Sequence, residues 1–140
     1  MAFTDIHMHI LYGTDDGARN EEEMCAIIDA AYKSGTRTIC CTPHMHPGYF
    51  GDNYDKVNEA YDCLLNYAKK KYPDIQLYLG NELRYAQECI TWLRQGICRT
   101  MNGTRYVLVD FSEAALEKKI CNGLAKICQL CLQENIHRIR

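Results

Sequence analysis

The sequence predicts an α/β protein with a parallel sheet, built from about four consecutive β/α units. Short runs of apolar and β-branched residues alternate with longer stretches whose apolar residues recur at helical spacing. This alternating order favours right-handed crossovers, which place successive strands parallel to one another. The length of 140 residues fits a single domain, and four β/α units amount to about half of a barrel.

Four strands are expected where β-like runs lie between turn signals. They are Phe3–His7, Thr36–Thr42, Ile75–Leu79 and Tyr106–Phe111. Residues 136–140 could begin a fifth strand. Because the carboxyl ends of parallel strands meet along one edge, any active site is expected at that edge.

Four helices are expected between and after these strands. Asn20 is a candidate N-cap for the first helix, with Glu23 as its capping-box partner, and Gly35 ends that helix. The remaining helices are expected at Tyr54–Lys71, near Tyr85–Gln95, and after a cap at Ser112. The inner face of the last helix is expected to carry Leu116, Ile120, Leu124, Ile127 and Cys131.

Composition excludes several classes of function. The net charge of −2 provides no general basic surface for nucleic acid, and no apolar run approaches the roughly 18 residues that span a membrane. The first residues lack the basic start and apolar stretch of a signal peptide. Nine cysteines, an odd number, indicate thiols in a reducing cytoplasm rather than a disulfide framework. Those expected at core positions are Cys25, Cys63, Cys121, Cys128 and Cys131.

Side chains that can bind metal ions follow each expected strand. In His7-Met8-His9, two imidazoles at i and i+2 of a strand point to one face, a common ligand pair. Asp16 lies in the next loop, where an Asp-Gly dipeptide alone would indicate only a turn. The later strands end near His44, Glu82 and Asp110. Imidazole and carboxylate ligands without cysteine suit zinc, manganese or iron in a site of two or three ions.

Such a cluster indicates hydrolysis of a phosphate ester. Metal ions can bind a phosphoryl oxygen, generate hydroxide at neutral pH and stabilise the leaving group. His46, Tyr49 and Phe50 follow His44 and are candidates for the wall of a substrate pocket. A cysteine-dependent phosphatase is excluded, because none of the nine cysteines is followed six positions later by an arginine. The Cys-x-x-Cys pair at 128–131 indicates core packing rather than a metal site.

Five sequence segments carry most of these candidates, in a fixed order along the chain. They are Asp5-Ile6-His7-Met8-His9-Ile10, Asp15-Asp16-Gly17, Thr42-Pro43-His44, Gly80-Asn81-Glu82-Leu83 and Tyr106-Val107-Leu108-Val109-Asp110-Phe111-Ser112. Together they resemble the PHP family, named for polymerase and histidinol phosphatase domains. The similarity is closest to its bacterial protein-tyrosine phosphatases of capsular and exopolysaccharide synthesis.

The resemblance implies a distorted (β/α)7 barrel with a trinuclear, often manganese-dependent site. His7 and His9 would bind one ion, Asp16 and His44 another, and Glu82 would bridge them.

Two departures from the family pattern stand out. Asp110 stands where the family usually has glutamate, so it retains a carboxylate that is one methylene shorter. The fifth-strand histidine and a later Asp-x-His pair of the family would lie beyond residue 140. The chain is therefore expected to be a single PHP domain over residues 1–140, truncated at its C-terminus.

The resemblance also implies a substrate: a phosphotyrosine protein, specifically a bacterial tyrosine kinase that controls polysaccharide synthesis. Two alternatives stay open. One is a non-catalytic half-barrel that binds a metal ion or a partner. The other is a PHP phosphatase acting on histidinol phosphate or another small phosphomonoester. An incomplete barrel exposes apolar surface, so a homo-oligomer is also expected.

Overall fold

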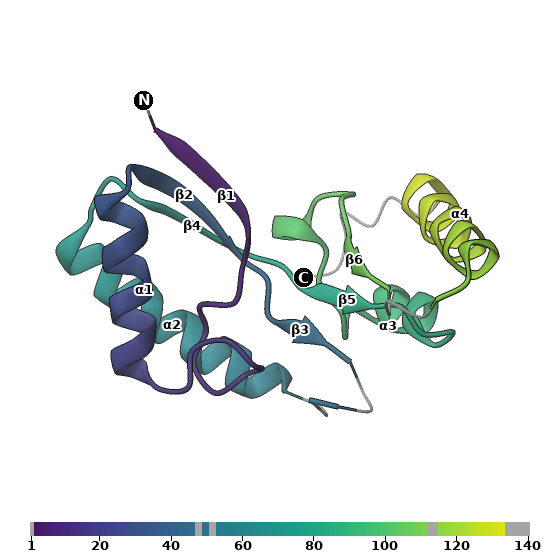
Figure 1. Cartoon of the computed structure of the whole chain (residues 1–140), viewed down its shortest axis with the longest axis horizontal. Coiled ribbons are helices and arrows are strands. Elements are labelled where there is room, and N and C mark those ends of the chain that lie inside the picture. Colours follow the sequence, from purple (N-terminus) through teal and green to yellow (C-terminus); the bar gives the residue numbers. More distant parts are fainter. Residues whose placement is uncertain (1, 47–48, 51–52, 112–114, 134–140) are drawn as a thin grey trace.

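A computed structural model describes residues 2–46, 49–50, 53–111 and 115–133 as an α/β fold with two small parallel sheets (Figure 1). The first sheet contains, in order, β1 (Phe3–Met8), β2 (Thr36–Cys41) and β4 (Gln76–Leu79). The second contains β3 (His44–Met45), β5 (Glu82–Arg84) and β6 (Leu108–Asp110). The helices are α1 (Glu21–Lys33), α2 (Tyr54–Lys71), α3 (Cys89–Gln95), the 3-10 turn η1 (Met101–Gly103) and α4 (Glu117–Gln133). All strand pairs are parallel, which confirms the predicted fold class.

The four-strand pathway expected from the sequence is present, but it is interrupted twice. Figure 1 shows β2 leading into β3, and β4 leading into β5. Pro43 has no N–H to donate, and β2 ends just before it. Backbone hydrogen bonds still cross the interruptions: Gly80 N–H donates to the Cys41 carbonyl at 2.9 Å, and Glu82 N–H donates to the Pro43 carbonyl at 3.1 Å. The second sheet therefore begins with His44 directly opposite Glu82.

Helices α1 and α2 cover one face of the first sheet (Figure 1). Helix α1 begins as predicted, because Asn20 Oδ1 accepts the Glu23 N–H at 2.9 Å. The Glu23 carboxylate does not complete a capping box in the expected way, since it accepts the N–H and the guanidinium of Arg19. Helix α2 has the predicted bounds. The core under these helices includes Ile10, Leu11, Met24, Ile28, Ile39, Val57 and Leu64.

Helices α3 and α4 pack around a second core. Its buried members are Met45, Leu83, Cys89, Leu93, Cys98, Ile127 and Leu130. Gly123 allows α4 to approach closely, because a Cβ atom there would lie 2.8 Å from Tyr85 Cζ. The face of α4 that meets the second core therefore carries Gly123, Ile127 and Leu130.

This orientation corrects the predicted inner face of α4. Leu116 and Leu124, expected to be inside, are 77% and 43% exposed. Cys121 and Cys128 are also exposed rather than buried, so of the Cys-x-x-Cys pair only Cys131 packs against the core as expected. The apolar residues of α4 cover more than one face of the helix. Sequence spacing alone could not show which of these faces meets the second sheet.

Some boundaries also move. The third helix begins at Cys89 rather than near residue 85, because residues 82–84 form β5. The Ser112 cap and the fifth strand expected at 136–140 lie outside the described residues. Among the helices that are described, none has both the length and the apolar character needed to cross a bilayer.

Candidate metal centre

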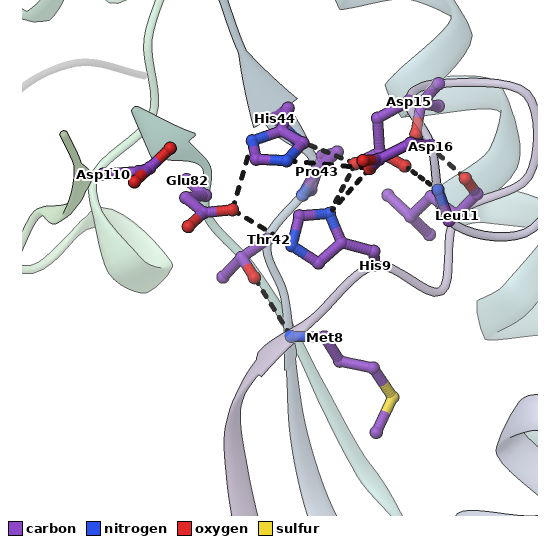
Figure 2. A network of polar contacts seen from close by, with 12 residues as sticks. Met8, His9, Leu11, Asp15, Asp16, Thr42, Pro43, His44, Glu82 and Asp110 are labelled. Atoms are coloured by element: carbon purple, nitrogen blue, oxygen red, sulfur yellow. Dashed lines mark hydrogen bonds and ion pairs between the residues drawn. The ribbon is translucent and has the colours of Figure 1, made fainter. Parts of the chain in front are cut away.

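One carboxylate oxygen lies at the centre of the site. Glu82 Oε2 is 3.2 Å from His7 Nε2, 3.0 Å from His9 Nε2 and 3.1 Å from His44 Nδ1. Glu82 begins β5 and is 8% exposed, while His7 and His9 stand at the carboxyl end of β1. Figure 2 shows His9, His44 and Glu82 turned toward one another from different elements. The sequence therefore correctly placed these side chains at one edge.

Asp16 extends the site on the side away from Glu82. Its Oδ1 is 3.6 Å from His44 Nε2 and 4.0 Å from His9 Nδ1. The Asp16 side chain is 72% exposed, so it can reorient toward an ion at little cost. Two sets of potential ligand atoms result, each within 4.8 Å: His7, His9 and Glu82, and His9, Asp16 and His44.

Asp15 is the residue that the sequence interpretation missed. Its side chain is fully buried, and its Oδ2 lies 2.8 Å from His9 Nδ1 and accepts the His44 N–H at 2.8 Å. Its Oδ1 accepts the Gly17 N–H at 2.9 Å. The signal was present as two adjacent aspartates before a glycine, but the pattern does not tell which of the two points inward.

This contact changes the proton affinities of both partners. The hydrogen bond that the Asp15 carboxylate accepts from His9 raises the pKa of His9 above its ordinary value, although burial acts in the opposite direction. Burial would raise the pKa of Asp15, but hydrogen bonds from His9 and from the backbone of His44 and Gly17 outweigh it and leave the pKa lowered.

Hydrogen bonds between Met8 and Thr42, 34 positions apart in the chain, hold the backbone around the site. Thr42 N–H donates to the Met8 carbonyl at 3.0 Å, and Thr42 Oγ1 accepts the Met8 N–H at 3.0 Å (Figure 2). These bonds fix the end of β1 beside the end of β2. The loop after β1 folds back so closely that a Cβ on Gly17 would lie 2.1 Å from the His9 carbonyl oxygen. Only glycine fits there, and this brings the two aspartates against His9.

Asp110 occupies a different environment. It ends β6 and forms an ion pair with Arg84, whose register position is directly opposite. Figure 2 shows it beside Glu82 but outside the connected network. It belongs to neither of the two ligand sets found among the described residues. Its role as a metal ligand stays a prediction.

An aromatic group lies next to His44. The Phe50 ring is parallel to the His44 ring at 5.4 Å, with an interplanar angle of 4°. The rings of His46 and Tyr49 meet edge-on at 5.1 Å, and Tyr49 is 84% exposed. Phe50 therefore lies beside one candidate ligand, and the contact of His46, Tyr49 and Phe50 with a substrate stays a prediction.

The donor set fits divalent metal ions. Imidazole nitrogen and carboxylate oxygen atoms together suit zinc, manganese and iron, whereas soft sites use thiolates. Neither ligand set includes a cysteine. Three imidazoles lie around one buried carboxylate, so a divalent ion placed there would have several ligand atoms within reach.

Comparison with known proteins places this chain in a family. The family described as capsular polysaccharide synthesis, CpsB/CapC, matches residues 3–136. The chain belongs to the CpsB/CapC family. It is 32% identical over 126 residues to the tyrosine-protein phosphatase CpsB of Streptococcus pneumoniae, covering 90% of this chain and 52% of that protein. It is 34% identical over 107 residues to the tyrosine-protein phosphatase YwqE of Bacillus subtilis, covering 76% of this chain and 42% of that protein.

Solved CpsB/CapC structures agree with the fold. Crystal structures of YwqE from Bacillus subtilis and CpsB from Streptococcus pneumoniae, described as unique metal-dependent tyrosine phosphatases, include a chain that matches with a TM-score of 0.79 and 29% identity. The match covers 92% of this chain and 51% of that chain. The chain thus spans about half the length of the relatives it matches. The resemblance to capsular tyrosine phosphatases is confirmed.

Proposed function

We propose that this chain is part of a metal-dependent protein-tyrosine phosphatase. The observation that carries the proposal is the contact of one Glu82 oxygen with three imidazole nitrogens, at 3.0 to 3.2 Å. The CpsB/CapC relatives named as tyrosine-protein phosphatases support the reaction class. The proposal includes a PHP-type domain over residues 1–140.

Each ligand has a proposed role. His7 and His9 hold one ion, Asp16 and His44 hold a second, and Glu82 lies between them. Asp110 is a further carboxylate, and its ion pair with Arg84 would have to open before it could bind an ion. Manganese is the proposed ion, with zinc or iron as alternatives and two or three ions in a complete site. When bound, such ions supply a Lewis acid for the phosphoryl oxygen and an activated water as nucleophile.

The remaining residues orient the substrate. His46 and Tyr49, with Phe50 beside His44, form an aromatic side to the site, where the ring of a phosphotyrosine would stack. The His7 side chain is 44% exposed, so the site is open on that side, as a protein substrate requires. The proposed substrate is the phosphotyrosine of a bacterial tyrosine kinase in the cytoplasm, and the proposed role is control of capsule synthesis.

The exposed Phe3 and Ile6 on edge strand β1 support a further proposal, that the chain forms a homo-oligomer. Light scattering over a range of concentrations would reveal it, and a strictly monomeric chain would contradict it.

Hydrolysis of a phosphotyrosine peptide by the purified 140-residue chain, with manganese added, tests the proposed function. We expect turnover that requires the metal and is lost in His44→Ala, because His44 contacts both Glu82 and Asp16. Asp29→Asn is the matched control. It removes a carboxylate of α1 that belongs to neither candidate ligand set, so turnover should be retained.

Three outcomes separate the alternatives. Manganese binding without turnover would favour a non-catalytic binding module. Faster hydrolysis of histidinol phosphate than of the peptide would favour a small-substrate phosphatase. Full turnover in His44→Ala would contradict the proposed site.

A further inference from the structure

We propose that Asp15 is a positioning residue: it fixes which nitrogen of His9 faces the ion and holds three ligand-bearing segments in register. It is not itself a candidate ligand. The inference rests on the proposed metal-dependent function and deepens it. The observations behind it are the three hydrogen bonds of Asp15 and the burial of its carboxylate.

The hydrogen bonds of Asp15 indicate which nitrogen of His9 carries the proton. Asp15 Oδ2 accepts the His44 N–H at 2.8 Å and lies 2.8 Å from His9 Nδ1. Asp15 Oδ1 accepts the Gly17 N–H at 2.9 Å. Both oxygens of Asp15 already accept a backbone N–H, and Nδ1 of His9 is placed to donate the third hydrogen bond to this carboxylate. Neutral imidazole has one N–H, so the lone pair then resides on Nε2.

The other ring nitrogen of His9, Nε2, faces Glu82 and His7. His9 Nε2 is 3.0 Å from Glu82 Oε2 and 3.0 Å from His7 Nε2. Nε2 therefore presents its lone pair to the ligand set formed with His7 and Glu82. An imidazole that binds a metal through one nitrogen typically donates from the other to a carboxylate, which fixes its tautomer and ring orientation.

The two ligand sets both include His9 when they are defined by distance alone. His9 Nδ1 is 4.0 Å from Asp16 Oδ1, but its proton is committed to Asp15 at 2.8 Å. His9 is therefore unavailable to the second ion. A second ion would then depend on Asp16 and His44.

The same carboxylate also connects the segments that carry these ligands. Its oxygens hold the His9 ring, the backbone of His44 in β3 and the backbone of Gly17, next to Asp16. The Asp15 side chain is fully buried, so water cannot replace a lost contact cheaply. Asp15 thus sets the spacing of both ligand sets at once.

Asparagine at position 15 keeps the size of the side chain but not its hydrogen bonds. An amide has one acceptor oxygen and one donor NH2, so it cannot accept from both sides as the carboxylate does. If its oxygen replaces Oδ1, its NH2 faces the His44 N–H and His9 Nδ1, so His9 must move its proton to Nε2, where it blocks the ion position. If its oxygen replaces Oδ2, its NH2 faces the Gly17 N–H, and the segment that carries Asp16 must move. Both orientations weaken metal binding, one through His9 and the other through Asp16.

The experiment combines a tautomer measurement with metal affinity. Nitrogen chemical shifts of histidine-labelled, metal-free protein at about pH 9, above the usual imidazole pKa, should show His9 protonated at Nδ1. Asp15→Asn should bind Mn²⁺ about 10- to 100-fold more weakly by electron paramagnetic resonance, and its His9 tautomer shows which way the amide turns. Asp29→Asn also removes a carboxylate that accepts three hydrogen bonds, and should leave both readouts unchanged.

Two results would overturn the inference: Nε2 protonation of His9 in the unaltered protein, or unchanged Mn²⁺ affinity in Asp15→Asn. If Asp15→Asn does not fold, the tautomer of the unaltered protein decides alone. Neither readout needs phosphatase turnover. Absent turnover with the expected tautomer and affinity would therefore contradict the proposed function and leave the role of Asp15 standing.

Discussion

The first sheet, with α1 and α2, differs from the second sheet in strand length and in how its helices pack. Strands β1 and β2 have six residues each, whereas β3 has two and β5 and β6 have three. The helices over the first sheet bury one consistent apolar side. Helix α4, over the second sheet, leaves Leu124 and Leu132 exposed at 43% and 77%. The first region thus has longer strands and more consistently buried helices than the second.

The candidate ligands lie where these two regions meet. His7, His9 and Asp16 belong to β1 and its loop, while His44 and Glu82 begin the second sheet. The candidate metal centre therefore depends on how the end of β1 and its loop meet the starts of β3 and β5. We call this meeting point the junction. Substitutions in the first core and at the junction should affect different measurements.

The largest effect is expected in the first core. Leu64→Ala should lower the free energy of unfolding by about 2–5 kcal/mol, because Leu64 is completely buried between α2 and the sheet. Urea denaturation measures it. Leu65→Ala, one residue along α2 and 38% exposed, is the control and should cost much less, about 1 kcal/mol or below. Equal losses would contradict a core confined to one side of α2.

A smaller loss of stability, but a severe loss of metal binding, is expected at the junction. Gly17→Ala would place a Cβ 2.1 Å from the His9 carbonyl oxygen, so the loop and His9 must separate. We expect a cost of about 1–3 kcal/mol and at least about tenfold weaker Mn²⁺ binding. Titration calorimetry measures the binding.

Gly13→Ala is the matched control for this loop. Gly13 has a positive φ of 67°, but a Cβ there meets nothing within 4 Å. The change should cost about 1 kcal/mol of backbone strain and leave Mn²⁺ affinity near its original value. Similar affinity losses in both variants would show that the loop, rather than the His9 contact, controls binding.

The smallest effect concerns pH and lies away from the junction. The Lys71 ammonium, with the hydroxyls of Tyr72 and Tyr67, lowers the pKa of Asp29 below its ordinary 3.8. A lowered folded-state pKa contributes stability above pH 3.8 that is lost as the pH falls through the folded-state value. Asp29→Asn should therefore flatten the acid side of the stability curve, by less than about 1 kcal/mol because the group is solvent-exposed. Urea midpoints between about pH 2 and pH 7 measure this, and an unchanged acid slope would count against the ion pair.

Local sequence signals were enough for much of the first region. Asn20 capped its helix as predicted, and α2 has the expected bounds of Tyr54 and Lys71. Convergence of His7, His9, His44 and Glu82 followed from one rule, that parallel strands share a carboxyl edge.

The remaining features depend on contacts between distant segments. Strands of two or three residues, such as β3 and β5, are too short to show a period. The inward position of Asp15 depends on how its loop folds against His9, which the Asp-Asp-Gly pattern does not reveal. The inner face of α4 depends on the approach of Gly123 to Tyr85, 38 positions earlier in the chain by their residue numbers.

The distribution of the nine thiols has a practical consequence. Cys41 and Cys98 are buried, and burial raises the pKa of Cys98 to about 12, so these thiols resist alkylation. Cys121 and Cys128 are the two exposed cysteines, and both are on α4. A maleimide fluorophore or spin label added briefly to the unmodified protein should react there first. Such a label would report on the docking of α4 in real time, without any engineered cysteine and without touching a candidate metal ligand.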